Sequence, residues 1–83
     1  MTREKVIDIL RKELPYFVSK YGVKRIGLFG SYAKGVPAKG SDVDLLVEFD
    51  RPIGLKFIEF AESIEKLLGR SVNILTPAGI EFK

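Results

Sequence analysis

The 83-residue chain contains neither cysteine nor histidine, which excludes several ways of building and equipping a small protein. Without cysteine it has no disulfide framework and no thiolate zinc site, and without histidine it lacks the commonest general base and metal ligand. Any bound metal ion must be held by oxygen atoms, which indicates Mg²⁺ or Mn²⁺. With 46% hydrophobic residues we expect a single domain over residues 1–83, and the formal charge of +3 is compatible with anionic partners.

The apolar segments are short, and none approaches the ~20 residues that would span a membrane. The first ten residues, MTREKVIDIL, are charged and amphipathic and lack the apolar centre of a signal peptide. We therefore expect a cytoplasmic protein without a membrane partner. Nucleic acid is not an expected partner either, because the basic residues are spread through the chain without an aromatic stacking motif.

The beginning of the chain is predicted to be helical, because apolar residues recur at helical spacing across residues 3–14. Pro15 is expected to break or kink this helix, since it lacks an N–H group and its ring collides with the preceding turn. A second helical piece then runs to Gly22, which is placed to end it. The side chains expected to face the core are Val6, Ile7, Leu10, Leu14, Phe17, Val18 and Tyr21.

Three strands and a longer helix are predicted after Gly22. Residues 23–29 (VKRIGLF), 43–49 (VDLLVEF) and 71–75 (SVNIL) have the composition of strands. Residues 55–68 carry apolar side chains at positions i, i+3, i+4 and i+7, which is typical of a helix with one buried stripe. The side chains expected on that stripe are Phe57, Phe60, Ala61, Ile64, Leu67 and Leu68.

The order of elements predicts an α/β fold in which helices cover one face of a small mixed sheet. Thr76 and Pro77 resemble the N-cap and first-turn proline of a short terminal helix. Within residues 43–49 the side chains must alternate between two faces. The apolar face carries Val43, Leu45, Val47 and Phe49, and the polar face carries Asp42, Asp44 and Glu48. We expect the polar face to be at least partly open.

Asp42 and Asp44 form the candidate site. Residues two apart on a strand point the same way and lie roughly 6.5–7 Å apart, so the two anions need a cation or a positive neighbour. Just upstream, Gly30 lets the backbone approach a ligand, Ser31 can cap a turn of helix that binds an anion, and Lys34 follows. Together these residues suit a nucleoside triphosphate with its Mg²⁺.

Each of these features also has an ordinary structural explanation. A Gly-Ser turn after a strand is usually only a turn, and an Asp-x-Asp pair at a strand edge is often solvated or caps a loop. Lys34 and Lys39 are more often surface charges than ligands. It is the combination of all these features within one short stretch that favours a site.

The motif GSYAKG followed by SDVDLLVEF resembles the signature of the minimal nucleotidyltransferases, within the DNA polymerase beta-like superfamily. The resemblance covers nearly the whole chain, since YGVKRIGLFGSYAKG is similar to the family's first strand and turn, and GRSVNILTP to its last strand. It implies a mixed sheet flanked by helices, with Asp42 and Asp44 as catalytic residues that hold Mg²⁺ or Mn²⁺. The nucleotide-binding residues that it implies are Gly30, Ser31, Lys34 and Ser41.

The reaction implied by the resemblance is transfer of a nucleotidyl group, usually AMP from ATP, with release of pyrophosphate. Stand-alone members of this size are often antitoxins, encoded beside a helical HEPN protein that is commonly a ribonuclease toxin. Some of them add AMP to a tyrosine of that toxin. On this resemblance we expect ATP as the substrate and a HEPN-type toxin as the protein partner.

One position, Asn73, departs from the family's pattern. Active members usually carry a third carboxylate on the last strand, in a context like VDLVTP, where this chain reads VNILTP. Strand alternation directs Asn73 toward the side of Asp42 and Asp44, but its neutral amide cannot accept a proton as a carboxylate does. Glu48 lies roughly 13 Å from Asp44 along the strand, too far to take the place of the missing group. We expect nucleotide binding to tolerate this change better than catalysis.

Two functions remain open on the sequence. The signature favours an enzyme that adds AMP to a partner protein, whereas Asn73 favours a family member that silences its partner by binding alone. In either case a docking surface is expected, and the apolar residues that offer one are Leu55, Ile58, Ile80 and Phe82. The alternatives are that Asn73 is only a strand-end residue bonded to backbone, and that the C-terminal tail folds onto the core.

Overall fold

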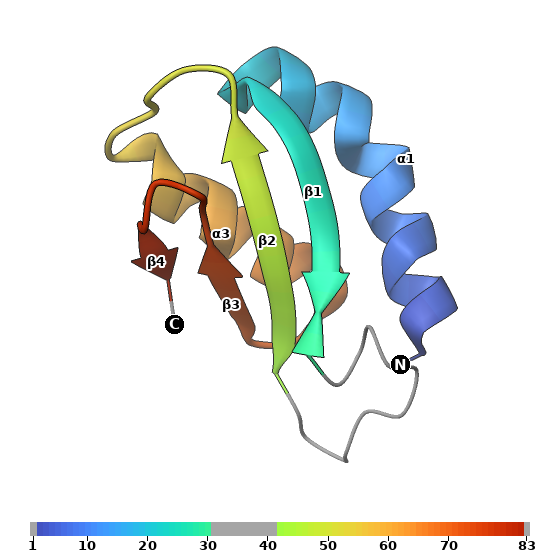
Figure 1. Ribbon diagram of the computed structural model, residues 1–83. Coiled ribbons are helices and arrows are strands. Elements are labelled where there is room, and N and C mark those ends of the chain that lie inside the picture. Colours follow the sequence, from blue (N-terminus) through green and yellow to red (C-terminus); the bar gives the residue numbers. More distant parts are fainter. Residues whose placement is uncertain (1, 31–41, 83) are drawn as a thin grey trace.

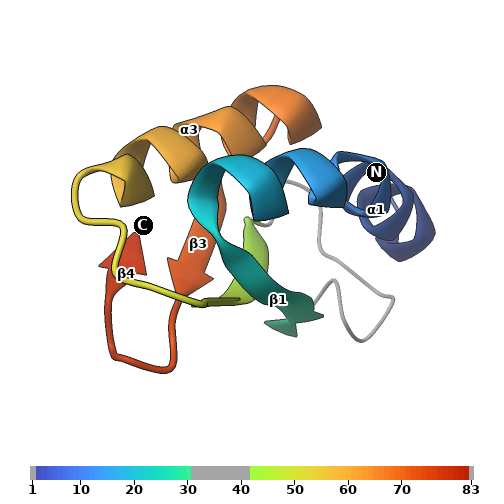
Figure 2. The same cartoon turned by 90° about the horizontal axis from the view of Figure 1, so that it is seen from above.

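The computed structural model describes residues 2–30 and 42–82, which form one mixed sheet with helices on a single face (Figures 1 and 2). In chain order the elements are α1 (Arg3–Tyr21), β1 (Val23–Phe29), β2 (Val43–Phe49), α3 (Lys56–Leu68), β3 (Val72–Leu75) and β4 (Glu81–Phe82). The strand order in the sheet is β1-β2-β3-β4. β2 and β3 are parallel, and the two outer pairs are antiparallel, which confirms the predicted fold class.

The helix α1 runs without interruption through Pro15, so the predicted break at this residue is wrong. Proline in a helix interior removes one backbone hydrogen bond at a cost of about 3 kcal/mol. Buried residues lie on both sides of it, Leu10 before and Phe17 after, and both belong to the same core. Packing of the two halves on one sheet therefore outweighs the local defect. No helix within residues 2–30 and 42–82 has the length and apolar character needed to cross a membrane.

The core lies between the sheet and the two helices. β2 supplies three fully buried side chains, Val43, Leu45 and Val47, which confirms the alternation predicted for this strand. Phe17 of α1 meets Phe60 of α3 edge to face, with ring centroids 5.2 Å apart. Each such buried side chain contributes about 1.5–3 kcal/mol relative to exposure. The helical layer is thus fixed on one face of β2, and the opposite face, which carries Asp44 and Glu48, is left open.

Two side chains predicted to be in the core, Val18 and Leu67, are instead exposed to 46% and 36%. Each is the sequence neighbour of a buried residue, Phe17 in α1 and Leu68 in α3. A helix turns by about 100° from one residue to the next, so a narrow contact stripe accommodates only one member of each pair.

The C-terminal segment forms a hairpin rather than the predicted short helix. Thr76 and Ile80 close the turn, because the amide of Thr76 donates to the carbonyl of Ile80 at 3.0 Å and the Thr76 hydroxyl accepts from the amide of Ile80 at 3.1 Å. Gly79, with φ of +85°, allows the chain to reverse within this turn. β4 then pairs with the free edge of β3, and this pairing satisfies more backbone groups than one isolated turn of helix.

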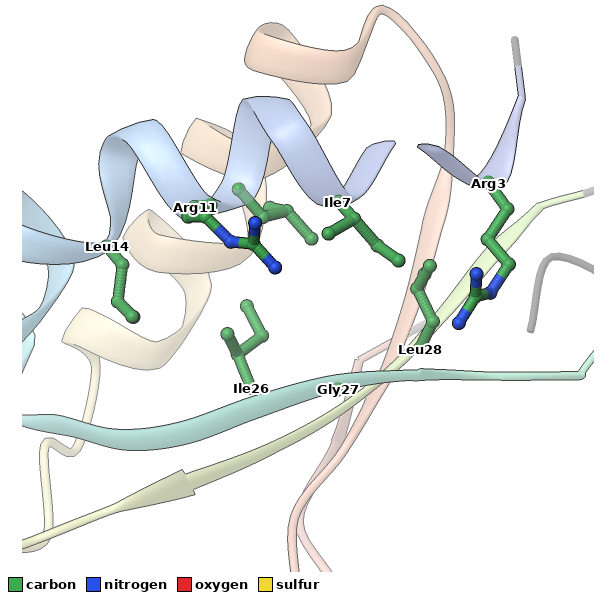
Figure 3. A pocket seen from close by; sticks show the side chains of 8 residues that line it. Arg3, Ile7, Arg11, Leu14, Ile26, Gly27 and Leu28 are labelled. Atoms are coloured by element: carbon green, nitrogen blue, oxygen red, sulfur yellow. The ribbon is translucent and has the colours of Figure 1, made fainter. Parts of the chain in front are cut away.

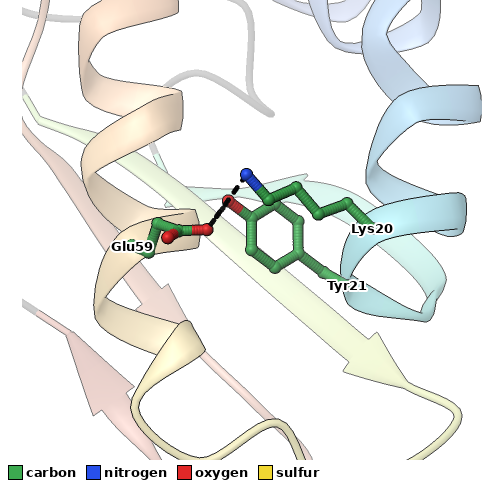
Figure 4. Close-up of polar contacts among 3 residues, drawn as sticks. All are labelled: Lys20, Tyr21 and Glu59. Carbon is green, nitrogen blue, oxygen red and sulfur yellow. Dashed lines mark hydrogen bonds and ion pairs between the residues drawn. The ribbon is translucent and has the colours of Figure 1, made fainter.

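A polar contact joins the two helices on their outer side (Figure 4). The hydroxyl of Tyr21 in α1 donates to Oε2 of Glu59 in α3 at 2.6 Å, and Nζ of Lys20 lies 3.3 Å from the same oxygen. The pKa of Tyr21 is raised to about 12, first because the ring is buried and then because the hydroxyl is bonded to Glu59. The pKa of Glu59 is lowered by the hydrogen bond from Tyr21 and by Lys20.

We expect Tyr21→Phe to lower the free energy of unfolding by about 1–2 kcal/mol near neutral pH, because the ring stays and only the hydrogen bond is lost. Because the pKa of Tyr21 is higher in the folded state than in the unfolded state, the folded protein keeps the phenolic proton to a higher pH. The stabilisation by Tyr21 is therefore complete below the ordinary pKa of 10 and is lost as the pH rises toward 12. Urea unfolding of both proteins at increasing pH should show the two stabilities converging. A gap that stays constant through this range would contradict the proposed origin of the stabilisation.

Candidate active site

The parallel pairing of β2 and β3 brings the polar residues predicted for the site together. Asp44 and Asn73 are register partners in this pair, so their side chains project from the same face of the sheet. Nδ2 of Asn73 donates to Oδ1 of Asp44 at 2.9 Å and lies 3.5 Å from Oδ2 of Asp42. Because a carboxylate only accepts hydrogen bonds, the amide turns its nitrogen toward both aspartates. Asn73 therefore touches both carboxylates, and its side chain is bonded to them rather than to backbone.

Gly30 closes the site from the side of β1. Phe29, the last residue of β1, pairs with Asp44, and the chain then turns at Gly30 with φ of +72°. A Cβ atom at this position would collide with Oδ2 of Asp44. The backbone conformation thus favours glycine here, and any larger side chain would in addition force the carboxylate of Asp44 to move. Ser31, Lys34 and Ser41, which the sequence also assigns to nucleotide binding, lie outside the described residues.

The groups at the site fit a hard divalent cation. Asp42 is exposed and Asp44 is half-buried, so two carboxylates reach solvent from one sheet face. The amide of Asn73 faces them with its nitrogen and would have to turn over to offer a third oxygen. Oxygen donors of this kind are those that Mg²⁺ and Mn²⁺ prefer. Within residues 2–30 and 42–82, however, no three acidic side chains gather in one place. Glu48, further along β2, is held instead by Arg25 at 3.2 Å and Lys24 at 3.8 Å.

The structure adds two apolar residues that the sequence analysis does not single out, Phe29 and Leu46. Both are exposed on the open face, at 40% and 45%, and they lie next to Asp44, one across the strand pair and one along β2. The alternation of β2 already places Leu46 on the polar face, so an apolar side chain between Asp44 and Glu48 is the signal that could have identified it. The site thus combines charged oxygens with an adjoining apolar surface.

Comparison with known proteins identifies the family to which this chain belongs. A family model described as nucleotidyltransferase domain matches residues 4–83. The chain belongs to this nucleotidyltransferase family. No solved structure matches the chain.

Two relatives illustrate the similarity. One, from Methanocaldococcus jannaschii, carries the name "Putative protein adenylyltransferase MJ1379" and is 42% identical over 95% of this chain and 82% of its own length. The other, from Thermococcus cleftensis, is named protein adenylyltransferase MntA and is 39% identical over 98% of this chain and 83% of its own length.

The contact between Gly30 and Asp44 can be separated from the backbone requirement by a matched pair of variants. Gly69 also has a positive φ, +66°, but a Cβ atom there would meet nothing within 4 Å. We expect Gly69→Ala to lower the free energy of unfolding by about 1–2 kcal/mol through backbone strain alone. Gly30→Ala should lower it by about 1 kcal/mol more, because the new methyl group overlaps Oδ2 of Asp44, and the carboxylate must then move and weaken its hydrogen bond with Asn73. Chemical denaturation of both variants measures the difference, and equal losses would show that the carboxylate is not packed against Gly30.

Proposed function

We propose that in the cytoplasm this protein binds ATP with Mg²⁺ or Mn²⁺ and transfers AMP to a partner protein. The observation that carries the proposal is the convergence of Asp42, Asp44 and Gly30 at one end of the sheet. The names of the relatives, protein adenylyltransferases, support the same reaction. In this reaction the oxygen of an acceptor hydroxyl bonds to the α-phosphorus of ATP and gives up its proton to a base or to solvent, the bond from that phosphorus to the α,β-bridging oxygen breaks, and pyrophosphate leaves.

Each residue then has a role that follows from its place. Asp42 and Asp44 hold the cation that accompanies the triphosphate, and when bound this ion supplies charge neutralisation at the phosphate oxygens. Gly30, without a side chain, leaves its backbone open to the phosphates. Phe29 and Leu46 form an apolar surface beside the carboxylates, on which a purine base can rest. The remaining phosphate contacts are assigned to Ser31, Lys34 and Ser41.

Asn73 supports a second candidate function, in which the protein neutralises its partner by binding alone. Its amide donates to Asp44 and cannot take the proton of an attacking hydroxyl. The two aspartates suffice for the cation that travels with the nucleotide, whereas a second cation or a general base lacks its carboxylate. Nucleotide binding without efficient transfer is the behaviour that this arrangement favours if no other group supplies the base.

The protein partner in both functions is proposed to be a helical HEPN-type toxin, with this chain as its antitoxin. A groove of about 790 Å³ supports a docking role, and its walls include Leu55, Ile58 and Ile80, exposed to 91%, 46% and 53%. The groove lies at the opposite end of β2 from the carboxylates. From Asp44 to Phe49 the strand rises about 17 Å, so a partner that uses both places must be a macromolecule.

We expect the double variant Asp42→Asn with Asp44→Asn to lose most of its affinity for an ATP analogue with Mg²⁺, by about tenfold or more, because both anionic ligands become neutral. Calorimetric titration with a non-hydrolysable analogue measures this affinity. The control is Glu4→Gln with Glu62→Gln, which changes the net charge equally at two exposed helical positions. Equal affinities of wild type and the aspartate variant would refute the cation site.

The two candidate functions are distinguished by Asn73→Asp. If this position lacks a catalytic carboxylate, wild type should transfer AMP slowly, and the variant should be faster by up to about 10²–10⁴-fold. Without metal the variant should be slightly less stable than wild type, because a hydrogen bond to Asp44 is replaced by repulsion, and Mg²⁺ should relieve this loss.

The assay follows labelled AMP from ATP onto the protein encoded by the neighbouring reading frame, with Asp44→Asn as the blank. Fast transfer by wild type that Asn73→Asp leaves unchanged would show that the third carboxylate is dispensable, and the protein would be an ordinary enzyme of its family. No transfer by either protein, together with tight partner binding, would favour the second function.

A further inference from the structure

A second groove lies between α1 and the free edge of β1. β1 is the end strand of the sheet, and on its side away from β2 no strand among the described residues pairs with it (Figure 1). The groove has a volume of about 290 Å³ and lies between the underside of α1 and the β1 backbone (Figure 3). The residues that line it are Arg3, Ile7, Leu10, Arg11, Leu14, Ile26, Gly27 and Leu28. An unpaired strand edge beside such a groove is a template for another strand.

The chemistry of this groove is basic at its rim and apolar at its floor. Arg3 and Arg11 extend from α1 toward β1, one near Leu28 and the other near Ile26 (Figure 3). The ion pairs among residues 2–30 and 42–82 use other basic side chains, and neither arginine has an acidic partner there. Gly27 adds no side chain that would keep a neighbouring backbone away. The groove thus offers two guanidinium groups that have no acidic partner among the described residues, together with apolar contacts and backbone hydrogen-bonding groups.

The spacing of the arginines matches an extended chain. Arg3 and Arg11 are eight residues apart on a helix, which corresponds to about 12 Å along its axis. On a strand, residues four apart point to the same face and lie about 13 Å apart. A strand added beside β1 could therefore place two acidic side chains under the two arginines, with an apolar side chain between them over Ile7 and Ile26.

Charge argues against residues 31–41 and against the β1 edge of a second copy as the occupant. Residues 31–41 contain Lys34 and Lys39 and no acidic residue, so they offer nothing to the arginines. Pairing of two copies through their β1 edges would bring together strands that carry Lys24 and Arg25 and again no acidic residue. Both arrangements would add positive charge to a positive site.

We propose that the groove between α1 and β1 binds an extended acidic segment of a partner protein, which adds to the sheet as a fifth strand. The segment has acidic residues four apart with an apolar residue between them. It lies along β1, whose last residue precedes Gly30, and so leads toward the carboxylates. The binding itself is independent of nucleotide and metal, and only its use to present an acceptor rests on the proposed function.

The test is a nuclear magnetic resonance titration of the ¹⁵N-labelled protein with the peptide TETLTET, whose acidic residues are four apart. We expect saturable shifts centred on the amides of β1, and at least about tenfold weaker binding to Arg3→Glu with Arg11→Glu, because two ion pairs become repulsive. The control Lys56→Glu with Lys66→Glu makes the same charge change on α3 and should bind as wild type does.

Two further peptides make the test specific. TETETLT has the same composition with acidic residues two apart, and it should bind wild type more weakly. TKTLTKT should bind the Arg3→Glu, Arg11→Glu variant better than wild type, a charge exchange that also shows the variant to be folded. Equal binding of TETLTET to wild type and this variant, or shifts that avoid β1, would overturn the proposal. Asp44→Asn should bind TETLTET as wild type does. Peptide binding and nucleotide binding are therefore tested independently, and failure of the proposed nucleotide site would not change the peptide result.

Discussion

The parallel pairing of β2 with β3 is the constraint on which the site depends. It sets Asp44 beside Asn73, although these residues are far apart along the chain. A parallel pair needs a crossover, and α3 provides it by packing Phe57, Phe60 and Ile64 onto the buried face. A slip of β3 by one residue would turn Asn73 into the core and Ile74 to the open face, so burial of the apolar set fixes the register and, with it, the site.

The amide at position 73 changes the electrostatics of the aspartate pair. Two carboxylates on one face repel each other, and the N–H groups of Asn73 direct a partial positive charge at both. A carboxylate in the same place would add a third negative charge and make the folded state depend more on a bound cation. The folded state with Asn73 therefore depends less on a bound cation. The site with Asn73 is also less suited to hold two cations than a site with a carboxylate at position 73, because it presents one anion fewer.

The sequence predicts the elements that are set by local alternation and fails where distant contacts decide. Strands 23–29 and 43–49 have the predicted bounds, and α3 and β3 begin one residue later than expected. The helix break at Pro15 is wrong because packing of both helix halves on one sheet overrides a local cost. The residues from Thr76 onward are compatible with a helix N-terminus and with a hairpin turn. The hairpin forms because β4 can pair with the free edge of β3. At the site, alternation predicts that Asp44 and Asn73 lie on the same side of the sheet. Their direct contact depends on how β2 and β3 are aligned, and the sequence of either strand by itself does not determine that alignment.

The carboxylates and the two grooves described above lie in different parts of the molecule, and their positions are not equivalent. The open face carries the carboxylates, the far end of β2 carries the larger apolar groove, and the edge of β1 carries the basic one. A protein held only in the apolar groove is about 17 Å from Asp44 and must reach along the whole strand to present a hydroxyl. A segment held along β1 needs no such reach, because β1 itself ends at Phe29, opposite Asp44. If the proposed function holds, the groove beside β1 is therefore the one whose position would couple docking to transfer, whereas the larger groove would hold a partner whether or not any transfer occurs.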